Sequence, residues 1–178
     1  MPASASGARM RVACYATAGA VALGAAAAPA LTIRATPKKI TAAGVGAVKL
    51  GKTYTSLRNA GLLGKIGPGC ELAGPGARSA ALRPPLGGSV DLTRSSPRRV
   101  RVISVTRGGT ARGAGIGSTL VAIKRAFPAA VVDHSTDRTF GITIVRVPKG
   151  AGGRLAFGIS TATRKVTLIG IPHIAICD

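Results

Sequence analysis

The chain has 178 residues and carries 25 lysines and arginines against 5 aspartates and glutamates, a formal net charge of +20. Aromatic residues make up only 3% of it, which argues against the stacking platforms that bind single-stranded nucleic acid. So large an excess of positive charge attracts polyanions, although arginines scattered along a chain can also serve solubility alone.

The first thirty residues have the layout of a Sec signal peptide. Arg9 and Arg11 stand before an apolar stretch, 12–28, and the sequence Ala-Pro-Ala at 28–30 forms an A-x-A cleavage site. The apolar stretch is rich in alanine and too weakly hydrophobic for a membrane anchor. We therefore expect cleavage after Ala30 and no stable membrane span in the mature protein.

The exported part, residues 31–178, has the size of one domain and can bury a single core without metals. Arg9 and Arg11 account for two of the +20 charges, so this domain would carry +18. Outside the cytoplasm nucleic acid is not an expected ligand, and the charge favours an anionic cell-surface polymer or an envelope protein as the partner. The predicted localisation is extracellular or in the cell envelope.

Three cysteines are present, and Cys14 falls within the signal peptide, with no lipobox before it. The remaining pair, Cys70 and Cys177, most simply forms one disulfide in an exported domain. Closing a loop of roughly a hundred residues would contribute about 4 to 5 kcal/mol in the chain-entropy model. A metal site would lack further ligands and a cysteine nucleophile would have few candidate bases, because His134 and His173 are the only histidines.

An internal repeat follows a short basic leader, residues 31–39. Residues 51–60, GKTYTSLRNA, align with residues 117–126, GSTLVAIKRA, as G-x-T-x3-[Leu/Ile]-x2-Ala. The phrase Thr-Ala-x-Gly precedes each copy, at 41–44 and at 110–113. The pattern predicts two degenerate repeats. Their bounds are about 40–109 and about 110–178.

Each copy of the repeat predicts the start of a short helix. Thr53 and Thr119 are expected to act as N-caps, and a glycine stands two residues before each of them. Leu57 and Ile123 would then face inward one turn later. We expect the first helix to end near Leu63-Gly64 and the second at Phe127-Pro128.

Strand-like patterns follow each predicted helix. The first half offers strands at 88–93 and 98–106, and residues 73–88 are rich in proline and glycine and predict a flexible loop. The second half offers strands at 139–147, 154–159 and 165–171, separated by turns at 148–153 and 160–164.

Alternation in these strands predicts which side chains share a face. One expected set is Phe140, Ile142 and Ile144, and another is Leu155, Phe157 and Ile159. We expect an antiparallel sheet with one face on the helices and the other partly exposed. The predicted fold class is α+β: one domain of two repeats, each a short helical segment followed by antiparallel strands.

Residues 46–53 match the P-loop pattern G-x-x-x-x-G-K-T, which would suggest a nucleotide site. No buried strand leads into Gly46, bulky Val48 and Leu50 occupy the loop, and the second repeat has Ser118 where the first has Lys52. We therefore reject a P-loop. The glycines of 113–117 do not form a dinucleotide fingerprint either, so no cofactor is expected.

Catalytic chemistry has one candidate. His134 stands among Asp133, Ser135 and Asp137, a set that could hold an acid–base pair, although polar residues after a short strand are more often a turn. His173 follows Pro172 and is interpreted as a packed or rim residue. No set of metal ligands is apparent.

Some phrases in the chain carry a resemblance to known proteins. They are Thr-Ala-Ala-Gly-Val-Gly at 41–46, Val-Lys-Leu-Gly-Lys-Thr at 48–53, Pro-Gly-Cys at 68–70, and the final Cys177. In these the chain resembles uncharacterised exported two-repeat proteins of high-GC bacteria. More distantly it is similar to one repeat of the secreted β-lactamase inhibitory protein and to the small lipoprotein of the outer-membrane assembly machine.

Both distant relatives are binding proteins, so the resemblance implies recognition without catalysis. The chain lacks the inhibitor's aromatic-rich contact sheet and has one exported cysteine pair, not two. We therefore expect an exported, non-enzymatic binding or envelope-associated protein. One alternative is a polyanion binder that uses Arg98, Arg99 and Arg101, and another is a small extracellular hydrolase that uses His134.

Overall fold

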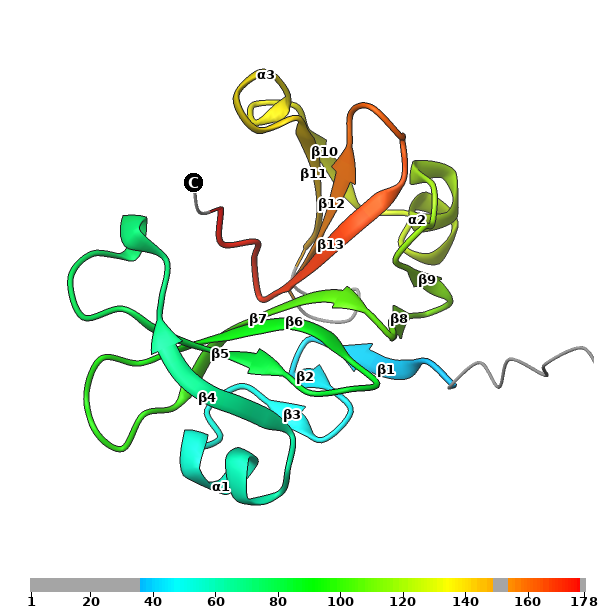
Figure 1. Ribbon diagram of the computed structural model, residues 1–178. Helices are drawn as coiled ribbons and strands as arrows, with labels where there is room; N and C mark the ends of the chain where they lie inside the picture. The colour runs from blue at the N-terminus through cyan, green and yellow to red at the C-terminus, as the bar shows by residue number, and fades with distance from the viewer. Residues whose placement is uncertain (1–35, 149–153, 177–178) are drawn as a thin grey trace, which may run out of the picture. The chain divides into compact units, whose positions relative to one another are not determined.

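An eight-stranded sheet dominates the computed structural model, which describes residues 36–148 and 154–176 (Figure 1). The N-terminal half supplies β4 (Leu63–Pro68), β5 (Arg78–Leu82), β6 (Gly87–Leu92) and β7 (Val100–Arg107). The C-terminal half supplies β10 (Val131–Asp133), β11 (Ile142–Val147), β12 (Leu155–Ser160) and β13 (Val166–Ile171). The order is β10-β11-β12-β13-β7-β6-β5-β4, and every neighbouring pair is antiparallel, as predicted.

A smaller sheet is built from short strands of both halves. These are β1 (Lys38–Thr41), β2 (Gly44–Val45), β3 (Val48–Lys49), β8 (Gly109–Ala111) and β9 (Ala114–Gly115), in the order β3-β2-β1-β8-β9. β1 pairs with β8 in parallel, and the Lys38 amide donates to the Gly108 carbonyl at 2.7 Å. The prediction that residues 31–39 are only a leader is therefore wrong from Lys38 onward, because β8 supplies a hydrogen-bonding partner that polar side chains do not reveal.

The described helices are short: α1 (Tyr54–Asn59), α2 (Leu120–Ala126), α3 (Asp137–Phe140) and the 3-10 turn η1 (Glu71–Ala73). Thr53 Oγ1 accepts a hydrogen bond from the Ser56 amide at 3.3 Å, and Thr119 Oγ1 accepts one from the Ala122 amide at 3.4 Å. Both N-caps are thus confirmed.

The predicted helix ends are half right. α2 stops at Ala126 ahead of Pro128, as expected, because proline cannot continue the helix. α1 stops earlier than predicted, at Asn59, and Gly61 with φ of +70° turns the chain. Leu63 and Gly64 therefore begin β4, where Leu63 is 1% exposed and packs in the core.

The main core lies between one face of the large sheet and the layer formed by the small sheet, α1 and α2. Leu57 and Ile123 are buried in it, as predicted. The Phe127 ring of the α2 terminus packs on the Phe157 ring of β12, with centroids 5.8 Å apart. Leu155, Phe157 and Ile159 all contribute to this core, so the shared face predicted for them is confirmed.

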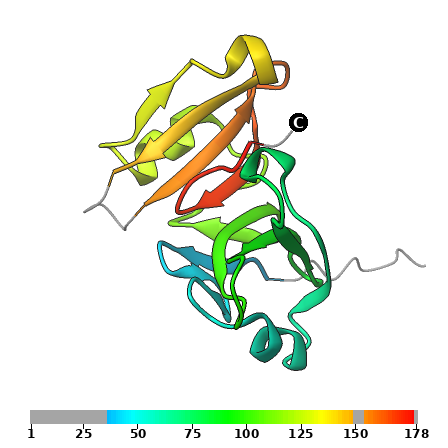
Figure 2. The ribbon, with the colours of Figure 1, turned by 90° about the vertical axis from the view of Figure 1, so that its left-hand side faces the viewer.

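The C-terminal segment, residues 172–176, covers the opposite face of the C-terminal half. Ile174 packs on Ile144 and Ala156 in a second, smaller cluster. Gly170 allows this close approach, because a Cβ there would stand 2.2 Å from the His173 carbonyl oxygen. Figure 2 shows the segment running back beside the chain around η1.

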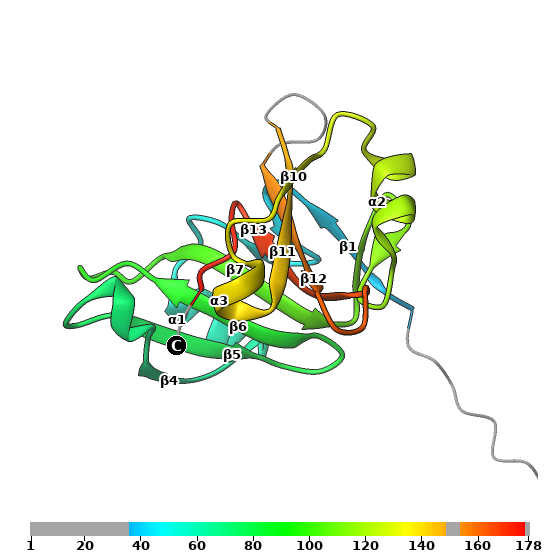
Figure 3. The ribbon, with the colours of Figure 1, turned by 90° about the horizontal axis from the view of Figure 1, so that it is seen from above.

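The opposite face of the N-terminal half is partly exposed and carries small or polar side chains, among them Ser79, Ser89 and Asp91. The expectation of one covered and one partly exposed face therefore holds for this half. Figures 1 and 3 show the strands of the two halves crossing at a steep angle, so the sheet is strongly twisted from end to end.

Two further sequence predictions need correction. Residues 73–88 are not one flexible loop, because β5 lies inside them and pairs with β4 on one side and β6 on the other. Phe140 does not share a strand face with Ile142 and Ile144, because it ends α3 and Gly141, with φ of +64°, separates it from β11.

The described residues thus form a mostly β protein with two sheets and few short helices, which fits α+β only loosely. They all belong to one compact unit. The predicted signal peptide with Cys14, residues 149–153 of the predicted turn at 148–153, and Cys177 lie outside the described residues. None of the helices in the described part is long and apolar enough to cross a membrane.

Candidate binding site

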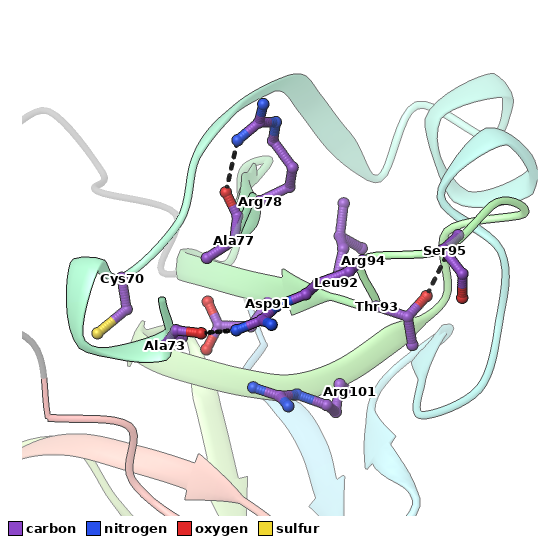
Figure 4. Close-up of a pocket in the computed structure, with 10 residues that line it drawn as sticks. All are labelled: Cys70, Ala73, Ala77, Arg78, Asp91, Leu92, Thr93, Arg94, Ser95 and Arg101. Atoms are coloured by element: carbon purple, nitrogen blue, oxygen red, sulfur yellow. Dashed lines mark hydrogen bonds between the residues drawn. The ribbon is translucent and has the colours of Figure 1, made fainter. Parts of the chain in front are cut away.

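A cleft of about 480 Å³ opens at one end of β5, β6 and β7, beneath the chain around η1 (Figure 4). Its walls include Arg78, Arg94, Arg101 and Asp91. We call it the arginine cleft. Its volume falls in the range of small-molecule sites, about 300 to 1,000 Å³.

The antiparallel register brings these distant residues together. Arg78 at the start of β5 lies opposite Leu92 at the end of β6, and Leu92 lies opposite Val100 at the start of β7. Arg94 follows two residues after Leu92. The pairing is irregular at Asp91 and Leu92, where β7 gains an extra residue, Arg101, as in a β-bulge.

Backbone carbonyls of the covering chain hold two of the arginines. The Arg94 guanidinium donates to the Ala73 carbonyl, and Arg78 donates to the Ala77 carbonyl at 2.9 Å. Figure 4 shows Arg78 turned toward Ala77, whereas the Arg94 guanidinium reaches the Ala73 carbonyl. A guanidinium has five donors, so Arg94 keeps most of its hydrogen-bonding capacity for a ligand.

Asp91 is the acid of the arginine cleft. Burial raises the pKa of its carboxyl group, while the charges of Arg101 and His173 act in the opposite direction. Within the described part of the chain, Asp91 forms no hydrogen bond and has no basic nitrogen within 4.0 Å. The cleft therefore presents both signs of charge without pairing them internally.

The structure separates the three predicted polyanion contacts. Arg101 lines the arginine cleft. Arg98 lies at its margin, where its guanidinium is 3.4 Å from the Arg94 carbonyl oxygen. Arg99 instead donates to the Gly51 carbonyl at 2.9 Å, alongside the chain that leads into α1.

Sequence reasoning missed Arg78 and Arg94 as members of this site. Arg78 fell inside the segment interpreted as a flexible loop. Arg94 stands in a polar turn before Pro97, a context that indicates only a turn. No local signal distinguishes either residue, because their proximity arises from strand pairing.

Cys70 lies at the rim of the arginine cleft, and its sulphur is 3.7 Å from the Ile176 carbonyl oxygen. The residue before Cys177 is thus next to Cys70. The disulfide between Cys70 and Cys177 stays a prediction, because Cys177 lies outside the described residues.

The cluster around His134 divides into two pairs. His134 Nδ1 lies 2.7 Å from Asp137 Oδ2, and this hydrogen bond lowers the pKa of Asp137. Asp133 pairs instead with Arg146 at 2.6 Å and accepts from the Ser135 amide at 2.9 Å. The hydrogen bonds with Ser135 lower the pKa of Asp133.

A cavity of about 250 Å³ lies beside His134 and includes Thr119 and Thr143 in its wall. No serine, threonine or cysteine side chain among the described residues is hydrogen-bonded to the His134 ring. The second histidine, His173, lies after β13, where it lines a larger apolar cavity of about 650 Å³ with Pro172 and Ile174.

The P-loop match does not have the geometry of a phosphate loop. Residues 46–53 contain β3, whose Val48 and Lys49 pair with β2 in an antiparallel ladder. The expectation that no buried strand leads into Gly46 is wrong, because the short strand β2 is buried and ends at Val45, but β2 is antiparallel to both β1 and β3 and is not a strand of a parallel sheet. Across residues 36–148 and 154–176, no three histidine, cysteine, aspartate or glutamate side chains could together hold a metal ion.

Fold and site together define a mostly β protein with a mixed-charge, arginine-rich cleft. Compared with models of protein families, with curated proteins and with solved structures, the chain shows no match. The resemblance drawn from the sequence therefore stays a prediction.

Proposed function

We propose that this chain is an exported, non-enzymatic protein that binds an anionic ligand of the cell surface through the arginine cleft. The observation that carries this proposal is the convergence of Arg94 and Arg101 on one cavity. Guanidinium groups bind carboxylates and phosphates through paired hydrogen bonds, which gives such a cavity its selectivity for acids.

Two features of the sequence, the predicted leader and the net positive charge, support the same proposal. A Sec-type leader at 1–30 would deliver the domain to the cell envelope or beyond, and a formal charge of +20 on the whole chain would concentrate anionic polymers near it. The ligand is thus an anionic cell-surface polymer or an acidic segment of an envelope protein. No cofactor takes part.

We also propose that the two halves are degenerate repeats. The strand order supports this, because β4 to β7 and β10 to β13 are each consecutive four-strand meanders and their last strands, β7 and β13, pair with each other. A capped helix precedes each meander. The predicted resemblance to the β-lactamase inhibitory protein supports recognition without catalysis.

The test is retention on an anionic resin, such as polyglutamate-agarose, in a salt gradient. The double variant Arg94→Gln/Arg101→Gln should elute at lower salt than the wild type, because two cleft contacts are lost and the remaining attraction is screened. The control Arg125→Gln/Arg138→Gln removes the same charge from exposed sites outside the cleft.

The control separates a site from mere charge. If the arginine cleft binds the ligand, the cleft variant elutes clearly earlier than the control variant. Equal shifts for the two variants would show that the excess charge acts as a diffuse field, and the proposed function would then be wrong.

One observation favours a second candidate function, a small hydrolase. The pair of His134 and Asp137 at 2.7 Å orients the imidazole so that Nε2 is available as a general base for water. Screening with ester, amide and phosphoester substrates tests it. Activity that disappears in His134→Ala would support the hydrolase, and a wild type without activity would dismiss it.

A further inference from the structure

The arginine cleft holds a carboxylate as well as guanidinium groups, and this limits which ligands fit it. Asp91 is half-buried and, within the described part of the chain, has no hydrogen-bonding partner or basic nitrogen within 4.0 Å. Arg101 lines the same cavity and attracts Asp91 only at longer range. Figure 4 shows Asp91, Arg94 and Arg101 among the residues that line the cleft, with the Arg94 guanidinium at the Ala73 carbonyl.

A ligand that carries only negative charge would be attracted by the two arginines and repelled by Asp91. A ligand that carries an amine beside its acid would satisfy all three groups. Its ammonium group would donate to the Asp91 carboxylate, and its carboxylate would accept from Arg101 and Arg94. Charge-assisted hydrogen bonds of both signs would then form in a partly desolvated cavity, where they are strongest.

We infer that the arginine cleft recognises a zwitterionic group of the α-amino acid type, an amine next to a carboxylate. This inference rests on the proposed function and names the chemistry of its ligand. The cavity of about 480 Å³ is larger than one amino acid, so the rest of a peptide or of a polymer that bears the group has room in it.

The unpaired Asp91 itself supports this assignment. A half-buried carboxylate without a partner destabilises a folded protein, and most proteins pair or expose such groups. Asp91 in the arginine cleft therefore lowers the stability of the free protein, and a ligand amine that pairs with its carboxylate would offset this destabilisation.

Isothermal titration of the purified chain with three related amino-acid probes tests the inference. The probes are alanine, N-acetyl-alanine, which lacks the amine charge, and alanine amide, which lacks the acid. We expect alanine to bind at least tenfold more tightly than either blocked form. Asp91→Asn should abolish the preference over the acetylated form, and Arg101→Gln should abolish the preference over the amide.

The control variant is Glu71→Gln, which removes an acid from the exposed turn η1 near the cleft. It should keep both preferences. Circular dichroism of each variant verifies that it is folded.

The outcomes separate this inference from the proposed function. Equal binding of alanine and N-acetyl-alanine to the wild type, or no binding of any of the three probes, would overturn the inference that the cleft recognises a zwitterionic group. The proposed function would still be judged by retention on polyglutamate, where the cleft and control variants are compared.

Discussion

Gly170 is one of several glycines at which the backbone leaves no room for a side chain. A Cβ there would stand 2.2 Å from the His173 carbonyl oxygen, so alanine would push residues 172–176 off the sheet. We expect Gly170→Ala to lower the free energy of unfolding by about 1 to 3 kcal/mol, the usual cost of overpacking. Urea unfolding measures it.

A strand glycine with open surroundings serves as the control for that experiment. An alanine Cβ at Gly67 in β4 would have no atom within 4 Å, and the residue has no left-handed backbone angle. Gly67→Ala should change stability by less than about 0.5 kcal/mol. Equal losses in the two variants would mean that the C-terminal segment does not pack closely on β13.

Asp91 gives the stability of the protein a pH dependence. Burial raises the pKa of its carboxyl above the ordinary value of 3.8, so the folded state binds the proton more tightly than the unfolded state. Stability therefore falls as pH rises from that value through the higher folded pKa. We expect Asp91→Asn to have a higher melting temperature than the wild type at pH 7.

The difference between the two proteins should disappear in acid, below the unfolded pKa of about 3.8, where wild-type Asp91 is protonated in both states. Melting curves of the wild type and Asp91→Asn from acid to neutral pH measure this difference. Glu71→Gln, at an exposed position, provides the comparison. A lower melting temperature for Asp91→Asn at neutral pH would show that the carboxylate has a stabilising partner.

At the scale of elements, the two N-caps decide where the helices begin. Thr53→Ala and Thr119→Ala should each lower the free energy of unfolding by about 1 kcal/mol, because a first-turn amide loses its acceptor. Serine at either position supplies a similar hydroxyl and should retain most of the stability. If serine costs as much as alanine, the threonine methyl group and not the cap is responsible.

The strands show where local sequence signals end. β7 and β13 are rich in valine and isoleucine and were predicted closely. β5, with the sequence Arg-Ser-Ala-Ala-Leu, has no β-branched residue and exists because β4 and β6 flank it. Strand propensity therefore predicts a strand only where its side chains are β-branched, and it misses a strand such as β5 that is held by its neighbours.

At the scale of the whole molecule, the predicted disulfide would tie the end of the chain to the rim of the arginine cleft. Cys70 Sγ lies 3.7 Å from the carbonyl oxygen of Ile176, the residue that precedes Cys177 in the sequence. Mass spectrometry of unreduced peptides should show Cys70 linked to Cys177. A link from Cys70 to Cys14 would contradict the prediction.

Reduction should then weaken the whole fold. The link closes roughly a hundred residues, and its loss would lower the free energy of unfolding by about 4 to 5 kcal/mol in the chain-entropy model. Unfolding with and without reductant measures this. The double variant Cys70→Ser/Cys177→Ser should behave like the reduced protein and no longer respond to reductant.

Two features of this protein follow from its sequence by itself. The starts of α1 and α2 were predictable, because an N-cap depends on a threonine and on amides a few residues away. The core faces of β12 and of the helices were predictable as well, since alternation and helical spacing report burial directly.

Only the tertiary structure decided the candidate site. Arg78, Arg94 and Arg101 come to line one cleft through the pairing of β5, β6 and β7, and the C-terminal segment brings His173 close enough to influence Asp91. Strand register depends on contacts between residues far apart in the chain, and a one-residue shift would turn these side chains to the other face. For that reason the three arginines predicted as one contact site from a local run lie in different places in the fold: Arg101 lines the cleft, Arg98 lies at its margin and Arg99 lies beside Gly51.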